Sequence, residues 1–388
     1  MQLDEESGTL SPLPEVLSHG LVAVSFFAFL SFFCSTSLLF YLTWRMISWK
    51  RKSGSGVQMN QFLFLVYNLL FADIQQSIAF LLNASALSKH AIVVESPTCF
   101  AQGWFVSTGD LSSSVFICAI AIHTFMSVVK EYRLPEGLFY GWIGSLWAFI
   151  YLMAILGPAM HGRDFYVRAS AWCWINDAYL KERLWLHYFW IFICIVSTLL
   201  IYAVIFITLR ARAHTSKLGT SIHRATPMMV MYPLIYVVCT MPLAAGRVYA
   251  LAGHTVTLRY FCVAGAMIAC NGWLDVLLYA GTRASIVFSE EPPSEETGLE
   301  TFAFLGKGHG MGTVTTIEAG GSTGRRLGLR GRSRESDSVE QLYGLDQIEI
   351  KGEVSVKVDV KESHGLVAEH GASRSWDATT GQSRLQEV

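Results

Sequence analysis

The stretch "FLFLVYNLLFADIQQSIAFLL", residues 62–82, is long and apolar enough to cross a lipid bilayer, for which a helix needs roughly 20 mostly apolar residues. It nevertheless carries a carboxylate, Asp73, and three amide side chains, Asn68, Gln75 and Gln76. A carboxylate at the centre of a membrane helix costs roughly 2.5–3.5 kcal/mol on insertion scales. This cost predicts that the polar side chains of the stretch face other helices or a hydrated cavity and not the lipid.

The composition of the chain is typical of a membrane domain followed by a soluble tail. Of its 388 residues, 52% are hydrophobic and only 15% are charged, whereas soluble domains carry about 25% charged residues. Residues 284–388 hold 17 acidic and 11 basic side chains, nearly half of all the charges in the chain. The remaining sequence is therefore strongly apolar, and it predicts an all-α membrane protein with many membrane-crossing segments.

Seven apolar runs predict seven membrane-crossing helices. They cover residues 20–43, 59–82, 98–129, 138–157, 187–209, 227–250 and 258–280. We therefore expect an extracellular N-terminal segment 1–19, a seven-helix bundle 20–283 and a cytoplasmic tail 284–388. The tail is rich in Gly, Ser, Glu and Arg and poor in aromatic residues, a composition typical of disorder.

Basic residues gather in two gaps between the runs, and neither gap contains an acidic residue. They are Arg45, Lys50, Arg51 and Lys52 after the first run, and Arg210, Arg212, Lys217 and Arg224 after the fifth. Because short loops rich in Lys and Arg stay on the cytoplasmic side of a membrane, we expect the N-terminus outside the cell. The tail then lies in the cytoplasm, and the chain is a multi-pass protein of the plasma membrane.

Three residues of the expected outer face suggest covalent modifications. Cys99 lies at the outer end of the third run, and Cys173 lies in "AWCWIN" of the second outer loop. Both face an oxidising compartment in this orientation, so we expect a disulfide between them. Asn83 begins the sequon Asn83-Ala84-Ser85 close to the membrane, which makes it a candidate site of glycosylation.

Ionisable groups inside the predicted membrane helices are the strongest indication of a functional site. Asp73, Asp110 and Asp275 lie in the second, third and seventh runs. Such residues are rare, and they usually face the interior of the bundle or a water-filled cavity. They are accompanied by other polar side chains: Asn68, Gln75, Gln76, Ser112, Ser113, Ser114, Asn271 and Tyr279.

Several short motifs resemble those of rhodopsin-like G-protein-coupled receptors. "NLLFAD", residues 68–73, is similar to their second-helix signature, in which Asp follows Asn by five residues. "DVLLY", residues 275–279, resembles the seventh-helix D/N-P-x-x-Y motif with valine in place of proline. "CTMP", residues 239–242, resembles the sixth-helix C-W-x-P motif with threonine in place of tryptophan. Ser113 stands where that family places a polar partner of the second-helix Asp, and the expected disulfide matches the one that joins the third helix to the second loop in that family.

Longer segments resemble fungal seven-helix receptors of the glucose- or nutrient-sensing and cAMP-receptor-like groups. They are "GDLSSSVFICAIAIHTF", "YPLIYVVCTMPLAAGR" and "NGWLDVLLYAGTR". The resemblance covers roughly residues 20–285. It implies a receptor without enzymatic activity or cofactor, which responds to an extracellular small molecule and acts through a Gα subunit on adenylate cyclase. Sugar, cyclic nucleotide, amino acid and oxidised lipid all remain open as ligands.

The chain departs from the family pattern at the inner end of the third helix. The sequence there reads "AIAIHTFMSVV", residues 119–129, in place of D-R-Y. His123 and Thr124 are the nearest polar groups. The resemblance implies that a G protein docks at this end, against His123 and the basic side chains Arg45, Lys50, Arg51, Lys52, Arg210, Arg212 and Arg224.

We expect the intramembrane polar residues to form a switch. Asp73 should face Ser113, Asn271 and Asp275 in a hydrated pocket at mid-membrane, with Asn68 and Tyr279 nearby. Such a cluster can rearrange between two sets of hydrogen bonds, with a proton or a sodium ion near Asp73 as a third party. The alternative is a polar cluster that only holds helices together, worth about 1 kcal/mol per contact.

The sixth helix should contain a hinge, because Pro233 and Pro242 remove backbone donors and are expected to kink it. A static bend is the alternative.

We also expect an outward-facing ligand pocket of aromatic and polar groups. Its candidate residues are Gln76, Trp104, Asp110, Trp172, Trp174, Tyr188, Arg247 and Arg259. Alternatively, the two arginines are snorkelling anchors, and the tryptophans belong to the interfacial aromatic belt.

Two other classes of seven-helix protein have to be weighed. A retinal protein requires a lysine in the seventh helix for its Schiff base, and residues 258–280 contain none. A small-molecule transporter commonly has an internal repeat, and the two halves of this bundle show no similarity. Transport remains the alternative to signalling.

Overall fold

The computed structural model describes residues 7–53, 60–130, 132–215, 219–282, 374–376 and 383–385. For residues 53, 212–215, 219–234 and 282 and for the two C-terminal segments it describes the backbone alone. The chain divides into two units, Met1–Thr313 and Val314–Val388. The second unit contains a short antiparallel pair of strands, β3 (Arg374–Trp376) and β4 (Ser383–Leu385), and the expectation of a disordered tail otherwise falls on residues outside those described.

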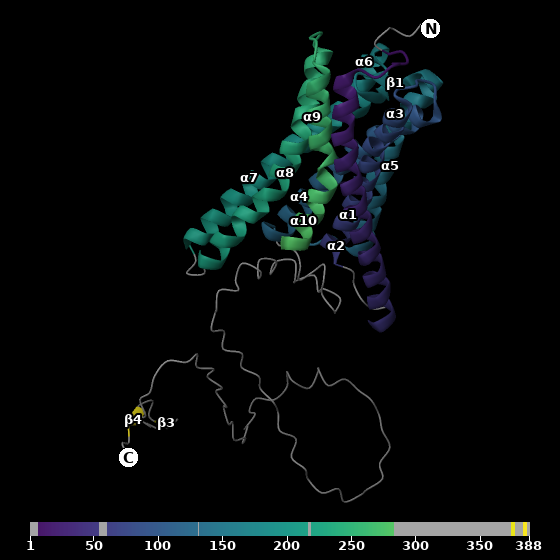
Figure 1. Ribbon diagram of the computed structural model, residues 1–388. Coiled ribbons are helices and arrows are strands. Elements are labelled where there is room, and N and C mark those ends of the chain that lie inside the picture. The colour runs from purple at the N-terminus through teal and green to yellow at the C-terminus, as the bar shows by residue number, and fades with distance from the viewer. Residues whose placement is uncertain are drawn as a thin grey trace, which may run out of the picture. The chain divides into compact units, whose positions relative to one another are not determined.

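The first unit is a bundle of long helices (Figure 1). These helices are α1 (Glu15–Ser53), α2 (Gln61–Leu81), α4 (Pro97–Val128), α5 (Glu136–His161), α7 (Phe189–Thr215), α8 (Gly219–Leu251), α9 (Leu258–Ala269) and α10 (Asn271–Thr282). In the described part of the chain, six helical segments are long and apolar enough to cross a membrane, and the end of α8, Ile235–Leu251, is a shorter apolar helix. The predicted fold, an all-α bundle of membrane-crossing helices, is confirmed.

The smaller elements lie at one end of this bundle, which we call the hairpin end (Figure 1). They are the helices α3 (Asn83–Lys89) and α6 (Leu180–Arg183), the strands β1 (Tyr166–Ala169) and β2 (Trp172–Ile175), the 3₁₀ turns Gly162–Phe165 and Asp177–Tyr179, and the π-helical segment Leu184–Tyr188.

Several helices begin where the sequence supplies a cap. The side chain of Asn60 accepts a hydrogen bond of 3.1 Å from the backbone nitrogen of Leu63 and so caps α2. Ser96 caps α4 in the same way, and Pro97 follows at the first helical position. These caps satisfy backbone donors that have no partner inside the helix.

The helices differ from the predicted runs at their ends and in one interior position. Helix α1 extends past residues 20–43 in both directions, since a helix need not stop where the bilayer does. Its C-terminal extension contains Arg45, Lys50, Arg51 and Lys52, and Lys and Arg are good helix formers. The run 258–280 is broken at Cys270 into α9 and α10. The apolar run predicts one continuous helix here, so this break is not predicted.

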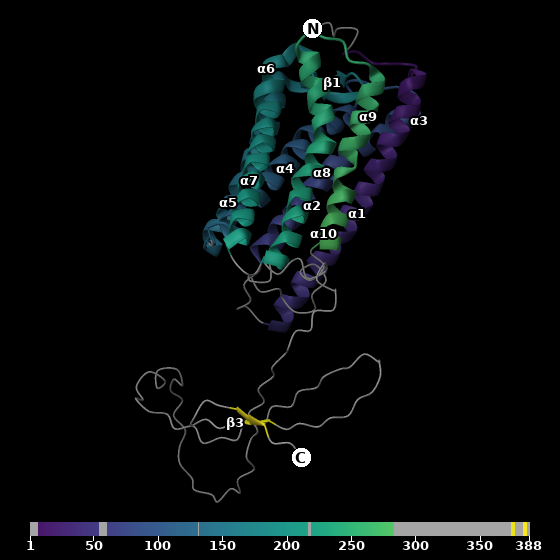
Figure 2. The ribbon, with the colours of Figure 1, turned by 90° about the vertical axis from the view of Figure 1, so that its left-hand side faces the viewer.

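Helices α2 and α4 pack closely at the centre of the bundle, and Gly109 makes this approach possible. A Cβ atom at Gly109 would lie only 2.5 Å from the backbone nitrogen of Gln76. Helix α2 also contacts α1, α9 and α10. Figure 2 shows α5 and α7 on one side of the bundle and α1 and α9 on the other.

The β1–β2 hairpin closes the hairpin end of the bundle. The two strands pair in antiparallel register, with Arg168 opposite Cys173, and all of their residues are buried. A disulfide joins Cys173 to Cys99 near the start of α4, with a Cα–Cα distance of 5.2 Å. The side chain of Gln102 accepts a hydrogen bond of 2.9 Å from the backbone nitrogen of Cys173. The hairpin is thereby fixed to α4.

Candidate functional site

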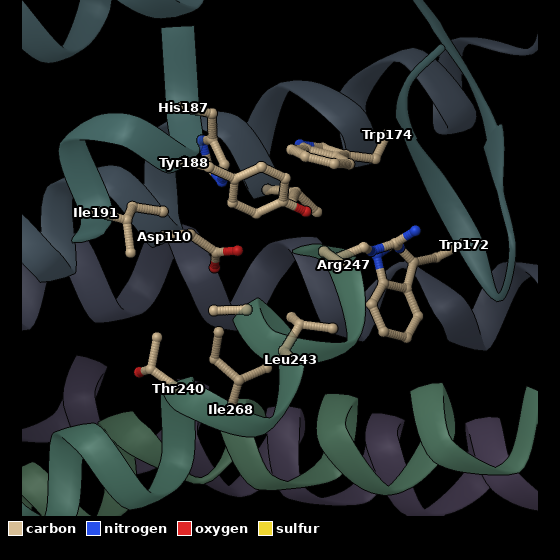
Figure 3. A pocket seen from close by; sticks show the side chains of 12 residues that line it. Asp110, Trp172, Trp174, His187, Tyr188, Ile191, Thr240, Leu243, Arg247 and Ile268 are labelled. Carbon is tan, nitrogen blue, oxygen red and sulfur yellow. The ribbon is translucent and has the colours of Figure 1, made fainter. Parts of the chain in front are cut away.

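A cavity lies beneath the hairpin (Figure 3). Its walls come from α4, β2, the π-helical segment, α7, α8 and α9. The residues that line it are Val106, Asp110, Trp172, Trp174, His187, Tyr188, Ile191, Thr240, Leu243, Ala244, Arg247 and Ile268. Apolar walls with a few polar groups are typical of small-molecule sites.

Two groups of opposite formal charge reach into this cavity from different helices. Asp110 comes from α4 and Arg247 from α8, and both side chains are buried. Figure 3 shows the carboxylate and the guanidinium on different sides of the hollow, with the ring of Tyr188 beside them. A ligand that both donates and accepts hydrogen bonds can therefore contact both groups at once.

Aromatic rings hold the guanidinium of Arg247. Its carbon Cζ lies 4.4 Å from the ring centre of Phe261, 5.4 Å from that of Trp174 and 5.5 Å from that of Trp172. Its Nη2 atom donates a hydrogen bond of 3.0 Å to the carbonyl of Ala169. The described residues form no ion pair with Arg247. Cation–π contacts and one carbonyl thus fix the group and leave further N–H donors for a ligand.

Two further polar atoms at the cavity are buried, and neither has a hydrogen-bond partner among the described residues. They are Nε1 of Trp174 and Nδ1 of His187. The other ring nitrogen of His187 is bonded to the backbone of Ser107. An indole N–H is a donor, and Nδ1 of a neutral imidazole whose other nitrogen donates is an acceptor. The cavity therefore offers both kinds of partner.

Trp174 also contacts Arg183. The guanidinium carbon of Arg183 lies 5.1 Å from the Trp174 ring centre. Arg183 itself is hydrogen bonded to the carbonyl of Ile175 and paired with Asp177. The indole of Trp174 therefore contacts two guanidinium groups.

A chain of amide side chains runs from the cavity toward the middle of the bundle. Nε2 of Gln76 donates a hydrogen bond of 2.9 Å to Oδ1 of Asp110. Oε1 of Gln76 accepts one of 3.3 Å from Nδ2 of Asn271, and the same nitrogen lies 3.4 Å from the hydroxyl of Thr240. Gln76 therefore lies next to the cavity and supports Asp110 without lining the cavity.

The carboxylate pair lies one helical turn further on. The hydroxyl of Ser113 donates a hydrogen bond of 2.7 Å to Oδ1 of Asp73. Asp275 is buried and interacts electrostatically with Asp73. Oδ2 of Asp73 and Oδ1 of Asn271 have no hydrogen-bond partner among the described residues. Unpaired oxygen acceptors of this kind suit a hard cation or a proton.

The break between α9 and α10 is bridged by a side chain from α1. The hydroxyl of Ser31 donates to the carbonyl of Ala269 and accepts a hydrogen bond of 3.2 Å from the backbone nitrogen of Trp273. One side chain thus satisfies a carbonyl and an N–H on the two sides of the break. The polar cluster and the break meet at Asn271, the first residue of α10.

Two expected members of the polar cluster make other contacts. Oδ1 of Asn68 accepts a hydrogen bond of 2.8 Å from the indole of Trp147, and its amide donates to the carbonyl of Phe64. The ring of Tyr279 is buried and lies 6.2 Å from that of Phe62. Helix geometry explains the different contacts of Asn68, because five residues at 3.6 per turn place it about 140° away from Asp73 around the helix axis.

Besides Gln76, two other expected members of the ligand pocket do not line the cavity. Trp104 is partly buried and packs against the apolar cluster under the hairpin. Arg259 lies exposed in the first turn of α9. The expectation that Arg259 joins Arg247 at the ligand is therefore wrong for this cavity, because its side chain points to the outside of the bundle.

The predicted hinge residues lie in an uninterrupted helix. Helix α8 continues through Pro233 and Pro242, and the carbonyl of Pro242 accepts a hydrogen bond of 2.6 Å from the hydroxyl of Tyr260. The side chain of Pro233 lies outside those described. A kink at these positions stays a prediction.

The residues expected at the G-protein side lie away from the hairpin end. Lys50, Arg51 and Lys52 are exposed in the last turn of α1, and Arg210 is exposed on α7. Arg45 lies over the ring of Trp49, 5.3 Å from its centre. The ring of His123 lies 6.5 Å from that of Phe62. The side chains of Arg212 and Arg224 are outside those described.

Asn83 is not available for a glycan in this structure. Its side chain is 1% exposed. Its amide nitrogen donates to the carbonyl of Phe80, and its Oδ1 accepts a hydrogen bond of 2.9 Å from Gln102. Both polar atoms are therefore engaged inside the bundle, which speaks against the candidate glycosylation of Asn83.

Sequence reasoning missed two polar residues of the cavity, His187 and Thr240. His187 begins the fifth predicted run, and an ionisable group there was a signal for a site. Thr240 replaces the tryptophan of the sixth-helix motif. The apolar lining residues, such as Ile191, Leu243 and Ile268, carry no signal that distinguishes them from other residues of the core.

Comparison with known proteins gives one family. The family described as "G protein-coupled glucose receptor regulating Gpa2" (Git3) matches residues 18–216, which is about half of the chain. The match covers α1 to α7 and the hairpin, and ends before α8. No individual curated protein matches the chain.

Proposed function

Because the chain belongs to the Git3 family of G protein-coupled glucose receptors, we propose that it senses a hexose or a closely related extracellular nutrient in the cavity beneath the hairpin. Ligand binding then activates a Gα subunit that controls adenylate cyclase. The observation that carries this proposal is the lining of the cavity, where Asp110 and Arg247 face a common space beside Trp172 and Trp174.

This lining suits a neutral polyhydroxylated ligand. Each sugar hydroxyl both donates and accepts a hydrogen bond, so the same ligand satisfies the carboxylate of Asp110 and the guanidinium of Arg247. Indole rings provide flat apolar surfaces for the C–H faces of a sugar ring. The free Nε1 of Trp174 and Nδ1 of His187 supply one further donor and one further acceptor.

Signalling follows by population shift. A ligand that binds one arrangement of the helices more tightly than the other favours that arrangement by its differential affinity. The inner ends of the helices would then offer a different surface to Gα. The polar cluster of Asp73, Ser113, Asn271 and Asp275 is the proposed switch, and a sodium ion near Asp73 is the proposed third party.

The proposed orientation sets the hairpin end outside the cell and the basic end of α1 in the cytoplasm. It rests on the Lys and Arg residues of the gaps. Lys50, Arg51 and Lys52 are then placed to contact the G protein together with the inner ends of α4 and α7. A protease-accessibility assay on sealed vesicles, with epitope tags at the two termini, tests the orientation.

The function is tested with a panel of hexoses, amino acids, cyclic nucleotides and oxidised lipids, with intracellular cAMP as the readout. A strain that lacks the Gα subunit is the control. We expect a cAMP response to a hexose that depends on Gα. A response to no sugar, or a sugar response that persists without Gα, contradicts the proposal. Hexose uptake into proteoliposomes containing the purified chain would favour a transporter.

A further inference from the structure

Gln76 is the one described residue whose side chain joins the cavity residue Asp110 to Asn271. Its amide nitrogen donates to Asp110 at 2.9 Å, and its amide oxygen accepts from Asn271 at 3.3 Å. In an amide the nitrogen donates and the oxygen accepts. A change at Asp110 that turns the Gln76 amide therefore also changes the hydrogen bond between Gln76 and Asn271. The side chain is 3% exposed, so solvent cannot replace either partner without cost.

A second residue of the cavity contacts the same side-chain nitrogen of Asn271. The hydroxyl of Thr240, which lines the cavity, lies 3.4 Å from Nδ2 of Asn271. Both hydrogen bonds of Asn271 are long, and its Oδ1 has no hydrogen-bond partner among the described residues. The amide of Asn271 is therefore held weakly, between α2 and α8, and a small displacement on either side favours one bond over the other.

Asn271 is also the first residue of α10, immediately after the break. Across the break, Ser31 contacts Ala269 and Trp273 on its two sides. Asp275, which interacts with Asp73, lies one turn beyond Asn271 on the same helix. A displacement of Asn271 therefore acts on the direction of α10 and on the carboxylate pair together.

The backbone on the other side of this contact is fixed. Gly109 brings α4 against α2 so closely that a Cβ atom would lie 2.5 Å from the backbone nitrogen of Gln76 and 2.6 Å from its Cα. The backbone of Gln76 therefore has no room to move toward α4. A change at Asp110 therefore reaches Gln76 through the hydrogen bond between their side chains.

We propose that Gln76 is the positioning residue that transmits the state of the cavity to the break between α9 and α10. A ligand that donates hydrogen bonds to Asp110 weakens the bond that Gln76 donates to it. The freed Nε2 of Gln76 then donates to Oδ1 of Asn271 and shifts the start of α10. This inference rests on the proposed function, because it takes the cavity as the ligand site. It adds a specific residue that need not touch the ligand.

The test compares Gln76→Leu with Gln75→Leu. Leucine has a similar size and removes both hydrogen bonds of Gln76. Gln75 is the neighbouring buried glutamine, but its Oε1 atom accepts from Tyr151 on α5 and not from the cavity. Equilibrium binding of radiolabelled D-glucose is measured on the full chain in nanodiscs, with and without nucleotide-free Gα. Thermal unfolding controls for folding.

In the wild type, Gα should tighten D-glucose binding by roughly 5–150-fold, the usual range of allosteric coupling. In Gln76→Leu this tightening should fall to about twofold or less, while binding without Gα stays within about threefold of wild type. Gln75→Leu should keep the wild-type coupling. Gln76→Asn keeps an amide that is too short to reach both partners, and it should lose coupling as Gln76→Leu does.

Three outcomes overturn the inference: wild-type coupling in Gln76→Leu, equal loss of coupling in Gln75→Leu, and equal loss of binding with and without Gα. If Gln76→Leu does not fold, Gln76→Asn decides. If the wild type binds no D-glucose, the proposed ligand is wrong, and the role of Gln76 is then tested by basal nucleotide exchange on Gα. A change in that rate in Gln76→Leu but not in Gln75→Leu supports transmission through Gln76, and equal rates overturn it.

Discussion

Ser31 on α1 and Ala269 at the end of α9 are joined by a hydrogen bond of 2.5 Å from the Ser31 hydroxyl to the Ala269 carbonyl. The two residues are 238 positions apart in the chain. The same hydroxyl accepts from the backbone nitrogen of Trp273 in α10. A broken helix inside a membrane leaves backbone groups without partners, and each costs several kcal/mol in lipid. The side chain of Ser31 therefore makes the break tolerable.

Ser31→Ala should destabilise the bundle by about 1–3 kcal/mol, because it leaves a buried carbonyl and a buried N–H unpaired. The midpoint of thermal unfolding in detergent micelles measures the effect. Ser25→Ala is the matched control on the same helix, since the Ser25 hydroxyl is buried and has no partner in the described part of the chain. Equal midpoints for the two variants would show that the break does not depend on Ser31.

Gly109→Ala should disrupt the contact between α2 and α4. The added Cβ would lie 2.5 Å from the backbone nitrogen of Gln76, so the two helices must separate and the hydrogen bond between Gln76 and Asp110 must lengthen. We expect the free energy of unfolding to fall by about 1–3 kcal/mol, the usual cost of overpacking a core.

Gly144→Ala is the control for this substitution. A Cβ at Gly144 on α5 meets no atom within 4 Å, and alanine is favoured over glycine in a helix by roughly 0.5–1 kcal/mol. Thermal unfolding should therefore show a lower midpoint for Gly109→Ala and an unchanged or higher one for Gly144→Ala. A wild-type midpoint for Gly109→Ala would contradict the close approach of the helices.

Most of the fold is predictable because membrane helices follow from local sequence. Apolar runs of sufficient length fix the helices, and Asn60 and Ser96 fix two of their starts. The break at Cys270 was not predicted, and the side chain that bridges it, Ser31, comes from a different helix. Local pattern carries no information on a contact of that separation.

The site was predictable where chemistry contrasts with its surroundings. Asp110, Trp172, Trp174, Tyr188 and Arg247 are polar or aromatic residues at or near apolar runs, and all five line the cavity. In contrast, the angle between residues around the helix axis decides which polar residues share a face. Gln76, three residues after Asp73, lies about 60° from it, and Asn68 lies about 140° from it. The second-helix motif alone placed Asn68 in the polar cluster with Asp73, whereas its side chain contacts Trp147.

Arg247→Lys should weaken hexose binding by about tenfold, or about 1.4 kcal/mol. Lysine keeps the charge, but it lacks the planar group that stacks on Phe261, Trp172 and Trp174 and offers several donors in a fixed geometry. Arg259→Lys is the matched control, because Arg259 is exposed and lies outside the cavity lining. Equilibrium binding of radiolabelled D-glucose measures both. Equal affinities of the two variants would exclude Arg247 as a ligand contact.

Asp73→Asn and Asp275→Asn should each alter signalling while surface expression stays largely intact. An asparagine keeps the size of the side chain but carries no charge and cannot bind a proton or a cation as a carboxylate does. Basal nucleotide exchange on Gα is measured at increasing sodium concentration. We expect sodium to change the exchange rate of the wild type and to leave both variants unaffected. The exposed Asp164→Asn is the control, with wild-type sodium dependence expected. If both buried variants signal and respond to sodium as the wild type does, the carboxylates only hold helices together, because neither their charge nor a bound cation then distinguishes the two receptor states.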